Sequence, residues 1–155
     1  MNTLVQNFYP RARRAIGWLE TLQPLAQLAA RLYVAHAFFL SGLTKIRSWE
    51  TTLALFEDEY HVPLLPTEVA AVMGTTGELV LPVLLALGLA GRFAAAGLSF
   101  VNVVAVISLA EIAPAALQQH EFWGSLLIGL LLWGPGRWSV DAWITRRLAT
   151  RASGT

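Results

Sequence analysis

Four stretches of this chain are apolar over the length that a helix needs to cross a lipid bilayer. The hydrocarbon layer is about 30 Å thick, so a spanning helix takes about 20 predominantly apolar residues. Residues 25–45, 67–90, 92–111 and 116–134 meet this requirement. Hydrophobic residues make up 55% of the chain and charged residues 14%, unlike the usual soluble domain. We therefore predict an all-α integral membrane protein, a four-helix bundle that forms a single domain over residues 1–155.

The segment before the first span, residues 1–24, has the pattern of an amphipathic helix that lies on a membrane surface. Its arginines come first, and apolar residues such as Ile16, Trp18 and Leu22 follow them. We predict that this segment is cytoplasmic and does not cross the bilayer.

Two further segments outside the spans have predicted structures. Between the first two spans, Ser48 precedes apolar residues at helical spacing, which indicates a short helix at the membrane interface. Beyond the last span, Gly134, Pro135 and Gly136 end the helix. Residues 135–155 are then a cytoplasmic tail.

Basic residues are concentrated at one end of the predicted spans, and they set the orientation. Lysine and arginine prefer the cytoplasmic side of a bilayer. An even number of spans places the following arginines at one side: Arg11, Arg13, Arg14, Arg92, Arg137, Arg146, Arg147 and Arg151. Only Lys45 and Arg47 flank the other side, next to the acidic loop 50–68. We predict a multi-pass protein of the bacterial inner (cytoplasmic) membrane with both termini in the cytoplasm.

Several functional classes are excluded by what the sequence lacks. There is no cysteine, so thiolate metal sites, iron–sulfur clusters, disulfides and Cys-linked haem are ruled out. There is no glycine-rich phosphate loop, nucleophile elbow or metalloprotease helix. No helical Glu-x-x-His motif supports a metal. We predict no metal site and no nucleic-acid partner, and any redox chemistry requires a borrowed cofactor.

Polar side chains inside the spans are the candidate site residues, because an ionisable group in lipid is costly and marks a pair, a relay or a ligand site. Glu78, Asn102 and His36 each lie about 15 Å from the start of a span at 1.5 Å per residue, near the midplane. Arg31 lies less deep, but its side chain is long enough to reach Glu78. Ser99 shares a helix face with Asn102. We predict that these faces converge.

Pro82 gives Glu78 a second polar feature. Proline has no N–H, so the backbone carbonyl of Glu78 loses its usual helical donor. A kink there is expected to open a polar niche in mid-membrane. The alternative, that the polar residues only hold the helices together through hydrogen bonds of about 0.6 kcal/mol each, stays open.

Other polar residues have simpler predicted roles. His36 is expected to make a hydrogen bond between helices. Lys45 is also a candidate for ligand binding or proton relay, and its side chain is expected to extend toward the outer surface. His120 and Glu121 lie near the outer end of the fourth span, where an interfacial anchor is the expected role. His120 and Glu121 are therefore candidate site residues at the outer face of the membrane.

Three segments together resemble the DoxX family of small four-helix membrane proteins. They are RLYVAHAFFLSGLTKIRSWE, GELVLPVLLALGLAGRFAAAGLSFVNVVAV and GPGRWSVDAW. The resemblance rests on their order and spacing over most of residues 25–143. The residues that carry it are Arg31, Gly42, Lys45, Glu78, Pro82, Gly88, Gly134, Pro135, Gly136, Ser139 and Asp141. The resemblance implies association with thiosulfate:quinone oxidoreduction and with redox complexes, without a universal catalytic residue.

The first functional hypothesis is a membrane subunit of an oxidoreductase-type complex. In it, a niche of Arg31, Glu78 and Asn102 binds a quinone-like headgroup or relays a proton. The cofactor is then a quinone, and whether the chain is itself an enzyme stays open.

The alternative is a non-enzymatic membrane anchor or a metal-stress accessory or transport protein. The segment TTLALFEDEYHVPLLP resembles family members found beside metal-stress proteins. In the anchor hypothesis, a periplasmic protein partner docks on Trp49, Phe56, Glu57 and Asp58. A homo-oligomer is a further alternative, since glycines in spans serve packing within or between subunits.

Overall fold

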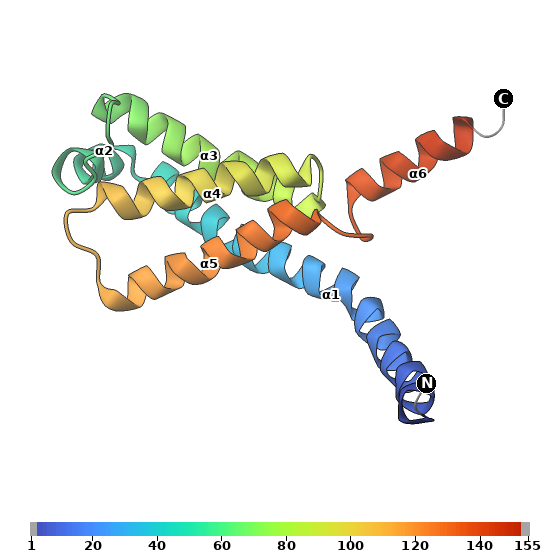
Figure 1. Cartoon of the computed structure of the whole chain (residues 1–155). Helices are drawn as coiled ribbons and strands as arrows, with labels where there is room; N and C mark the ends of the chain where they lie inside the picture. Colours follow the sequence, from blue (N-terminus) through green and yellow to red (C-terminus); the bar gives the residue numbers. More distant parts are fainter. Residues whose placement is uncertain (1–2, 153–155) are drawn as a thin grey trace.

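The computed structural model describes residues 3–152 and is all-helical, as predicted (Figure 1). It has six helices within this range. They are α1 (Thr3–Arg47), α2 (Trp49–Asp58), α3 (Thr67–Leu87), α4 (Gly91–Ser108), α5 (Pro114–Trp133) and α6 (Val140–Ala152). The side chains of residues 3–12, 15 and 152 are not described, so Arg11 of the predicted basic flank lies outside the described residues.

Helices α1, α3, α4 and α5 pack against one another around one apolar core. Helix α3 lies between α1 and α4, α4 also packs on α5, and α5 contacts α1 (Figure 1). The core residues recur every three or four positions, so each helix turns one apolar face inward. The fully or almost fully buried members are Val34, Phe38, Leu85, Ala94, Ala95, Leu98, Leu127 and Leu130.

The outward faces of these helices are also apolar. Large exposed hydrophobic side chains include Leu32, Leu40, Val72, Val80, Val83, Phe93, Phe100, Val103, Ile107 and Ile128. A soluble protein would not expose so much apolar surface, whereas a bilayer solvates it. Within the described residues, α3 and α4 are long and apolar enough to cross a membrane by length and composition alone.

The turn between α3 and α4 is a tight connection between two antiparallel helices. Gly88 adopts a left-handed conformation with φ +65°, and Ala90 follows with φ +48°. Helix α3 therefore ends at Leu87, three residues before the predicted end of the span. It runs through Pro82 as one helix.

The N-terminal segment differs from the prediction. Residues 1–24 were expected to form a helix separate from the first span, but α1 is continuous from Thr3 to Arg47 and includes Pro24. One proline removes one helical hydrogen bond, which the surrounding strong helix formers tolerate. The N-terminal part of α1 extends beyond the other helices, with Trp18 and Leu19 exposed (Figure 1). That it rests on a membrane surface stays a prediction.

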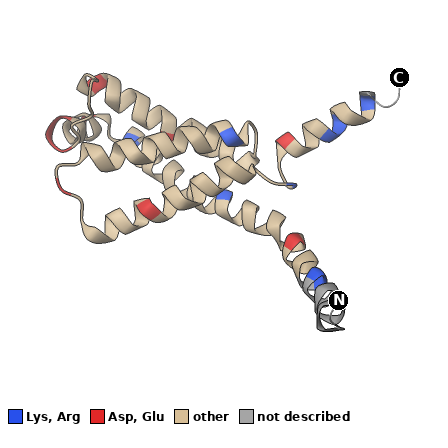
Figure 2. Cartoon of the chain, in the orientation of Figure 1, with Lys and Arg blue, Asp and Glu red and all other residues tan. Residues whose placement is uncertain are grey.

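Two further helices, α2 and α6, complete the described part of the chain. The short helix predicted after Ser48 is α2, and it begins at Trp49. The C-terminal tail contains α6, which the sequence analysis did not assign, and α6 projects away from the other helices (Figure 1). Arginines gather mainly at the end with α6 and the N-terminus, and acidic residues mainly around α2 at the other end (Figure 2).

Candidate functional site

A buried ion pair joins α1 to α3. The Nζ atom of Lys45 lies 2.5 Å from Oε2 of Glu78, and only 11% and 10% of the two side chains is exposed. The same ammonium group donates a second hydrogen bond to Ser41 Oγ at 2.9 Å. Because a lysine ammonium has three N–H groups, one donor remains.

This pairing corrects the predictions for both Lys45 and Arg31. In an α-helix, side chains lean toward the N-terminus of their own helix. Lys45 therefore folds back along α1 over Ser41 instead of extending to the outer surface. Glu78 leans toward the N-terminal end of α3, where Lys45 lies. Arg31 leans the other way and does not meet Glu78.

Close contact between the two helices supports the ion pair. Gly42 lies one turn before Lys45 on α1, and a Cβ atom placed there would lie 2.9 Å from the side chain of Leu79 and 3.1 Å from the backbone of Glu78. The missing side chain lets the α1 backbone approach α3 at this point. Lys45 and Glu78 are thus brought together by packing as well as by charge.

The ion pair forms part of the wall of an apolar cavity of about 250 Å³ between α2, α3 and α4. Phe56, Tyr60 and Val62 line it on one side, and α4 provides residues such as Val101 and Val104. Ser108 also lines the cavity, and its buried hydroxyl has no hydrogen-bond partner within the described protein. The cavity therefore combines an apolar lining with a few polar groups, as small-molecule sites do.

Tyr60 is the second polar group of the cavity that the sequence analysis did not assign. Burial raises the pKa of its phenol, and the negative charges of Glu78 and then Glu59 raise it further. Tyr60 therefore keeps its proton and remains a hydrogen-bond donor at neutral pH.

Helix α2 and the segment after it cover one end of the cavity. Thr52 Oγ1 donates to the Lys45 carbonyl at 2.8 Å, and the His61 N–H donates to the Ser108 carbonyl at 2.9 Å. Phe56 is only 8% exposed and packs on Ala70 and Ala71.

The burial of Phe56 corrects its predicted role in docking a partner. A residue at the inner face of α2 packs on α3 because the amphipathic helix turns its apolar side inward. The other three predicted docking residues remain accessible: Trp49, Glu57 and Asp58 are exposed.

Arg31 belongs to a different cluster at the opposite end of the molecule. Its side chain is buried, with 1% of the residue exposed, and Nη2 donates to the backbone carbonyl of Trp138. Gly88 lies directly against it, because a Cβ atom there would approach Arg31 Nη1 to 2.0 Å. Arg31 therefore fastens the segment between α5 and α6 to the α3–α4 turn.

Asp141 completes this junction as a cap for α4. Its two carboxylate oxygens accept hydrogen bonds from the N–H groups of Ala90 and Gly91, each at 2.8 Å. Its own N–H donates to the Gly88 carbonyl at 3.0 Å. A carboxylate at a helix N-terminus satisfies free N–H groups and interacts favourably with the helix dipole.

Substituting Asp141 with alanine is expected to lower the free energy of unfolding by about 1–2 kcal/mol, as for loss of a helix cap. The measurement is thermal unfolding of the purified protein in detergent. Asp58→Ala, at an exposed position of α2, is the matched control and is expected to change the stability by less than about 0.5 kcal/mol. Equal effects of the two substitutions would contradict the capping role.

Asn102 also has partners other than those predicted. Its Oδ1 lies 2.8 Å from His120 Nδ1, and its Nδ2 donates to the His120 carbonyl at 3.0 Å. Asn102 faces α5, whereas Glu78 pairs with Lys45 of α1. The predicted cluster of Arg31, Glu78 and Asn102 therefore divides into three separate contacts.

The remaining candidates lie outside the cavity. His120 is half-buried and packs edge-on against Trp123 at 5.1 Å, so it joins α4 to α5 rather than acting as a free interfacial anchor. Ser99 donates back to the Ala95 carbonyl of its own helix at 2.8 Å. His36 is exposed on α1 and does not form the predicted contact between helices, and Glu121 is exposed on α5. Among the described residues, no group of three or more His, Asp or Glu side chains is arranged so that it could hold a metal ion.

Comparison with known proteins identifies the family. The sequence model of the DoxX family matches residues 26–111, which run from α1 to just beyond α4 and include both Lys45 and Glu78. No curated protein and no solved structure matches the chain. The family match covers more than half of the sequence and agrees with the apolar outer surface of the helices. The chain therefore belongs to the DoxX family and is a membrane protein.

Proposed function

We propose that this protein is the membrane subunit of an oxidoreductase-type complex and that the cavity beside Lys45 and Glu78 binds a quinone-like headgroup. The observation that carries the proposal is the ion pair in the wall of an otherwise apolar cavity. A buried ion pair is a poor source of stability, because desolvation of the two charges offsets their attraction. Its position at a cavity favours a role in binding a ligand or moving a proton.

The polar groups of the cavity suit a quinone headgroup. Such a group is a flat apolar ring with two carbonyl acceptors, and it supplies two-electron redox chemistry when bound. The third N–H of Lys45, the phenol of Tyr60 and the unpartnered hydroxyl of Ser108 are available donors. The Glu78 carboxylate lies in the cavity wall beside the Lys45 ammonium, and the apolar lining accommodates the ring itself.

The distribution of charges supports an arrangement of the helices in the membrane. We propose that α1, α3, α4 and α5 all cross the bacterial inner membrane and that both termini are cytoplasmic. The excess of arginine at the end with α6 and the N-terminus supports this orientation (Figure 2). Glu78 then lies about 16 Å from the outer end of α3, near mid-membrane, at 1.5 Å per residue.

Filling the cavity tests the proposal. Val104 lines the cavity, whereas Val103 on the same helix is 55% exposed on the outer face. We expect Val104→Trp to weaken the binding of decylubiquinone at least about tenfold, because the larger side chain occupies the space of the ring. Val103→Trp is the matched control and is expected to bind as the original protein does.

The measurement is equilibrium dialysis of decylubiquinone against the purified protein in detergent. Unfolding temperatures of both variants establish that they are folded. Absence of saturable binding by the original protein, or equal affinities of the two variants, would overturn the proposal.

The exposed acidic face of α2 favours a second candidate, a membrane anchor for a basic partner on the outer side. Glu50, Glu57 and Asp58 of α2 are exposed, and so is Glu59, which follows the helix. For this role, the Glu57→Lys, Asp58→Lys variant is expected to lose its partner in purification from native membranes while it keeps quinone binding. Retention of every outer-side partner would count against the anchor.

A further inference from the structure

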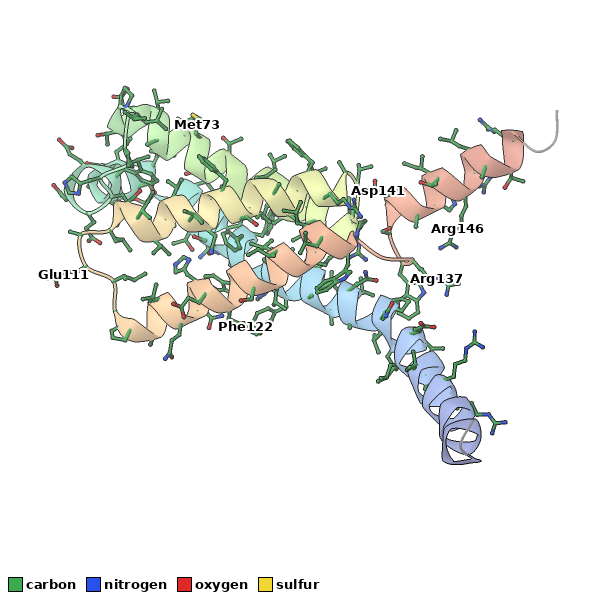
Figure 3. The ribbon with its side chains drawn as sticks, in the orientation of Figure 1. Met73, Glu111, Phe122, Arg137, Asp141 and Arg146 are labelled. Carbon is green, nitrogen blue, oxygen red and sulfur yellow. The ribbon has the colours of Figure 1, made fainter. Side chains whose placement is uncertain are left out.

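Arginine and tryptophan side chains gather where the start of α6 lies next to the C-terminal end of α3. Trp138 and Trp143 are 58% and 56% exposed, although tryptophan is usually buried in a protein core. Arg137 and Arg146 lie at the same end, as Figure 3 shows, and Arg146 Nη2 donates to the Arg137 carbonyl at 2.8 Å. These four residues line a hollow of about 410 Å³ that also includes Leu87, the last residue of α3.

We propose that this hollow, between the C-terminal end of α3 and α6, binds the phosphate headgroups of anionic phospholipids. The proposal concerns the cytoplasmic leaflet and depends on the protein being embedded in a membrane, but not on the cavity beside Lys45.

The position of the hollow matches the headgroup layer. Leu87 is 52% exposed and ends an apolar helix, so it marks the boundary of the hydrocarbon. Tryptophan is enriched at this boundary, because its ring has an apolar body and a polar N–H. The exposed rings of Trp138 and Trp143 therefore lie where acyl chains meet headgroups.

The charge of the hollow matches a phosphate. The arginine guanidinium presents paired N–H donors that fit phosphate oxygens. Neither Arg137 nor Arg146 forms a salt bridge with a described residue. Asp141, the acid nearest in sequence, already accepts two backbone hydrogen bonds at the start of α4.

Helix α6 also carries basic, aromatic and apolar side chains beyond the hollow. Arg147 lies over the ring of Trp143, with its Cζ 5.0 Å from the ring centroid, and Leu148 is 59% exposed. Arg151 follows one turn later in the same helix. No other helix covers α6 in Figure 1. A basic and aromatic helix of this kind binds anionic membrane surfaces.

Lipid titration of the full chain tests the site. The protein in detergent is titrated with phosphatidylglycerol or phosphatidylcholine, and the bound lipids are counted by native mass spectrometry. Each arginine near an anionic surface strengthens binding about fivefold. We therefore expect Arg137→Gln, Arg146→Gln to weaken phosphatidylglycerol binding about 25-fold and to leave phosphatidylcholine binding unchanged.

Two controls make the result specific. Arg13→Gln, Arg14→Gln removes the same charge from exposed positions on α1 and is expected to retain the preference. Decylubiquinone binding is expected to be unchanged in both double variants, which separates this site from the cavity. The proposal is overturned if the original protein shows no preference for phosphatidylglycerol, if both double variants lose it equally, or if millimolar inorganic phosphate displaces the lipid.

Discussion

The Gly88→Ala variant is expected to lose about 2–4 kcal/mol of unfolding free energy, from left-handed backbone strain of about 1 kcal/mol and overpacking of about 1–3 kcal/mol. Gly88 has φ +65°, which an L side chain rarely adopts. A Cβ atom there would also lie 2.0 Å from Arg31 Nη1 and 2.5 Å from Ser139 Cβ. The buried arginine has little room to move. The measurement is the unfolding temperature of the purified protein in detergent.

Gly17→Ala is the matched control for this substitution. Gly17 lies in α1, and a Cβ atom there would meet no other atom within 4 Å. Alanine stabilises a helix interior by about 0.5–1 kcal/mol relative to glycine. We therefore expect Gly17→Ala to unfold at the same or a higher temperature. An unfolding temperature of Gly88→Ala equal to that of the original protein would show that Gly88 is not confined by Arg31.

The second large effect is expected from breaking the ion pair. Removing one partner of a buried pair leaves an uncompensated charge and costs about 3–5 kcal/mol. We therefore expect Lys45→Met and Glu78→Gln each to unfold at a markedly lower temperature. Lys45→Met, Glu78→Gln together removes both charges and is expected to regain most of the lost stability. The coupling free energy of this double-mutant cycle is the measurement.

Quinone binding separates the functional role of the pair from its structural role. The double variant is expected to be folded and to bind decylubiquinone at least about tenfold more weakly, because it lacks the Lys45 donor and the Glu78 carboxylate. Glu121→Gln, at an exposed position of α5, is the matched control. Additive losses of stability in the two single variants would contradict the ion pair, and unchanged binding in the double variant would leave it with a structural role only.

The core helices were largely predictable because their signals are local. Apolar length indicated α3 and α4, and Ser48 indicated the start of α2. The prediction failed where a helix continues through a proline, as α1 does at Pro24, because surrounding residues outweigh one lost hydrogen bond. Helix α6 was missed because it is short and polar, so it does not have the apolar length of a membrane span.

The Lys45–Glu78 pair could have been predicted from the sequence. The sequence analysis paired Glu78 with Arg31 and expected Lys45 to extend toward the outer surface, although both basic residues lie on α1. The direction of side chains along a helix distinguishes them, because the lysine leans toward Glu78 and the arginine leans away. Applying this rule to the predicted topology would have selected Lys45.

Other contacts depend on distant parts of the chain. Arg31 binds the carbonyl of Trp138, which is 107 residues away, and Asp141 caps a helix that begins 50 residues before it. Nothing in the spacing of either residue indicates its partner. The glycine at position 88 and the aspartate at position 141 acquire their roles only when the α3–α4 turn and the start of α6 lie side by side.

The sequence by itself determined that this chain is helical and suited to a membrane, and at which end its basic residues collect. Transfer into lipid sums over residues one at a time, so apolar length and flanking charge suffice. Only the tertiary structure decided which polar groups meet, and it divided one expected cluster into three. A hydrogen bond requires two atoms at about 3 Å, and that distance depends on how the helices rotate and pack against one another.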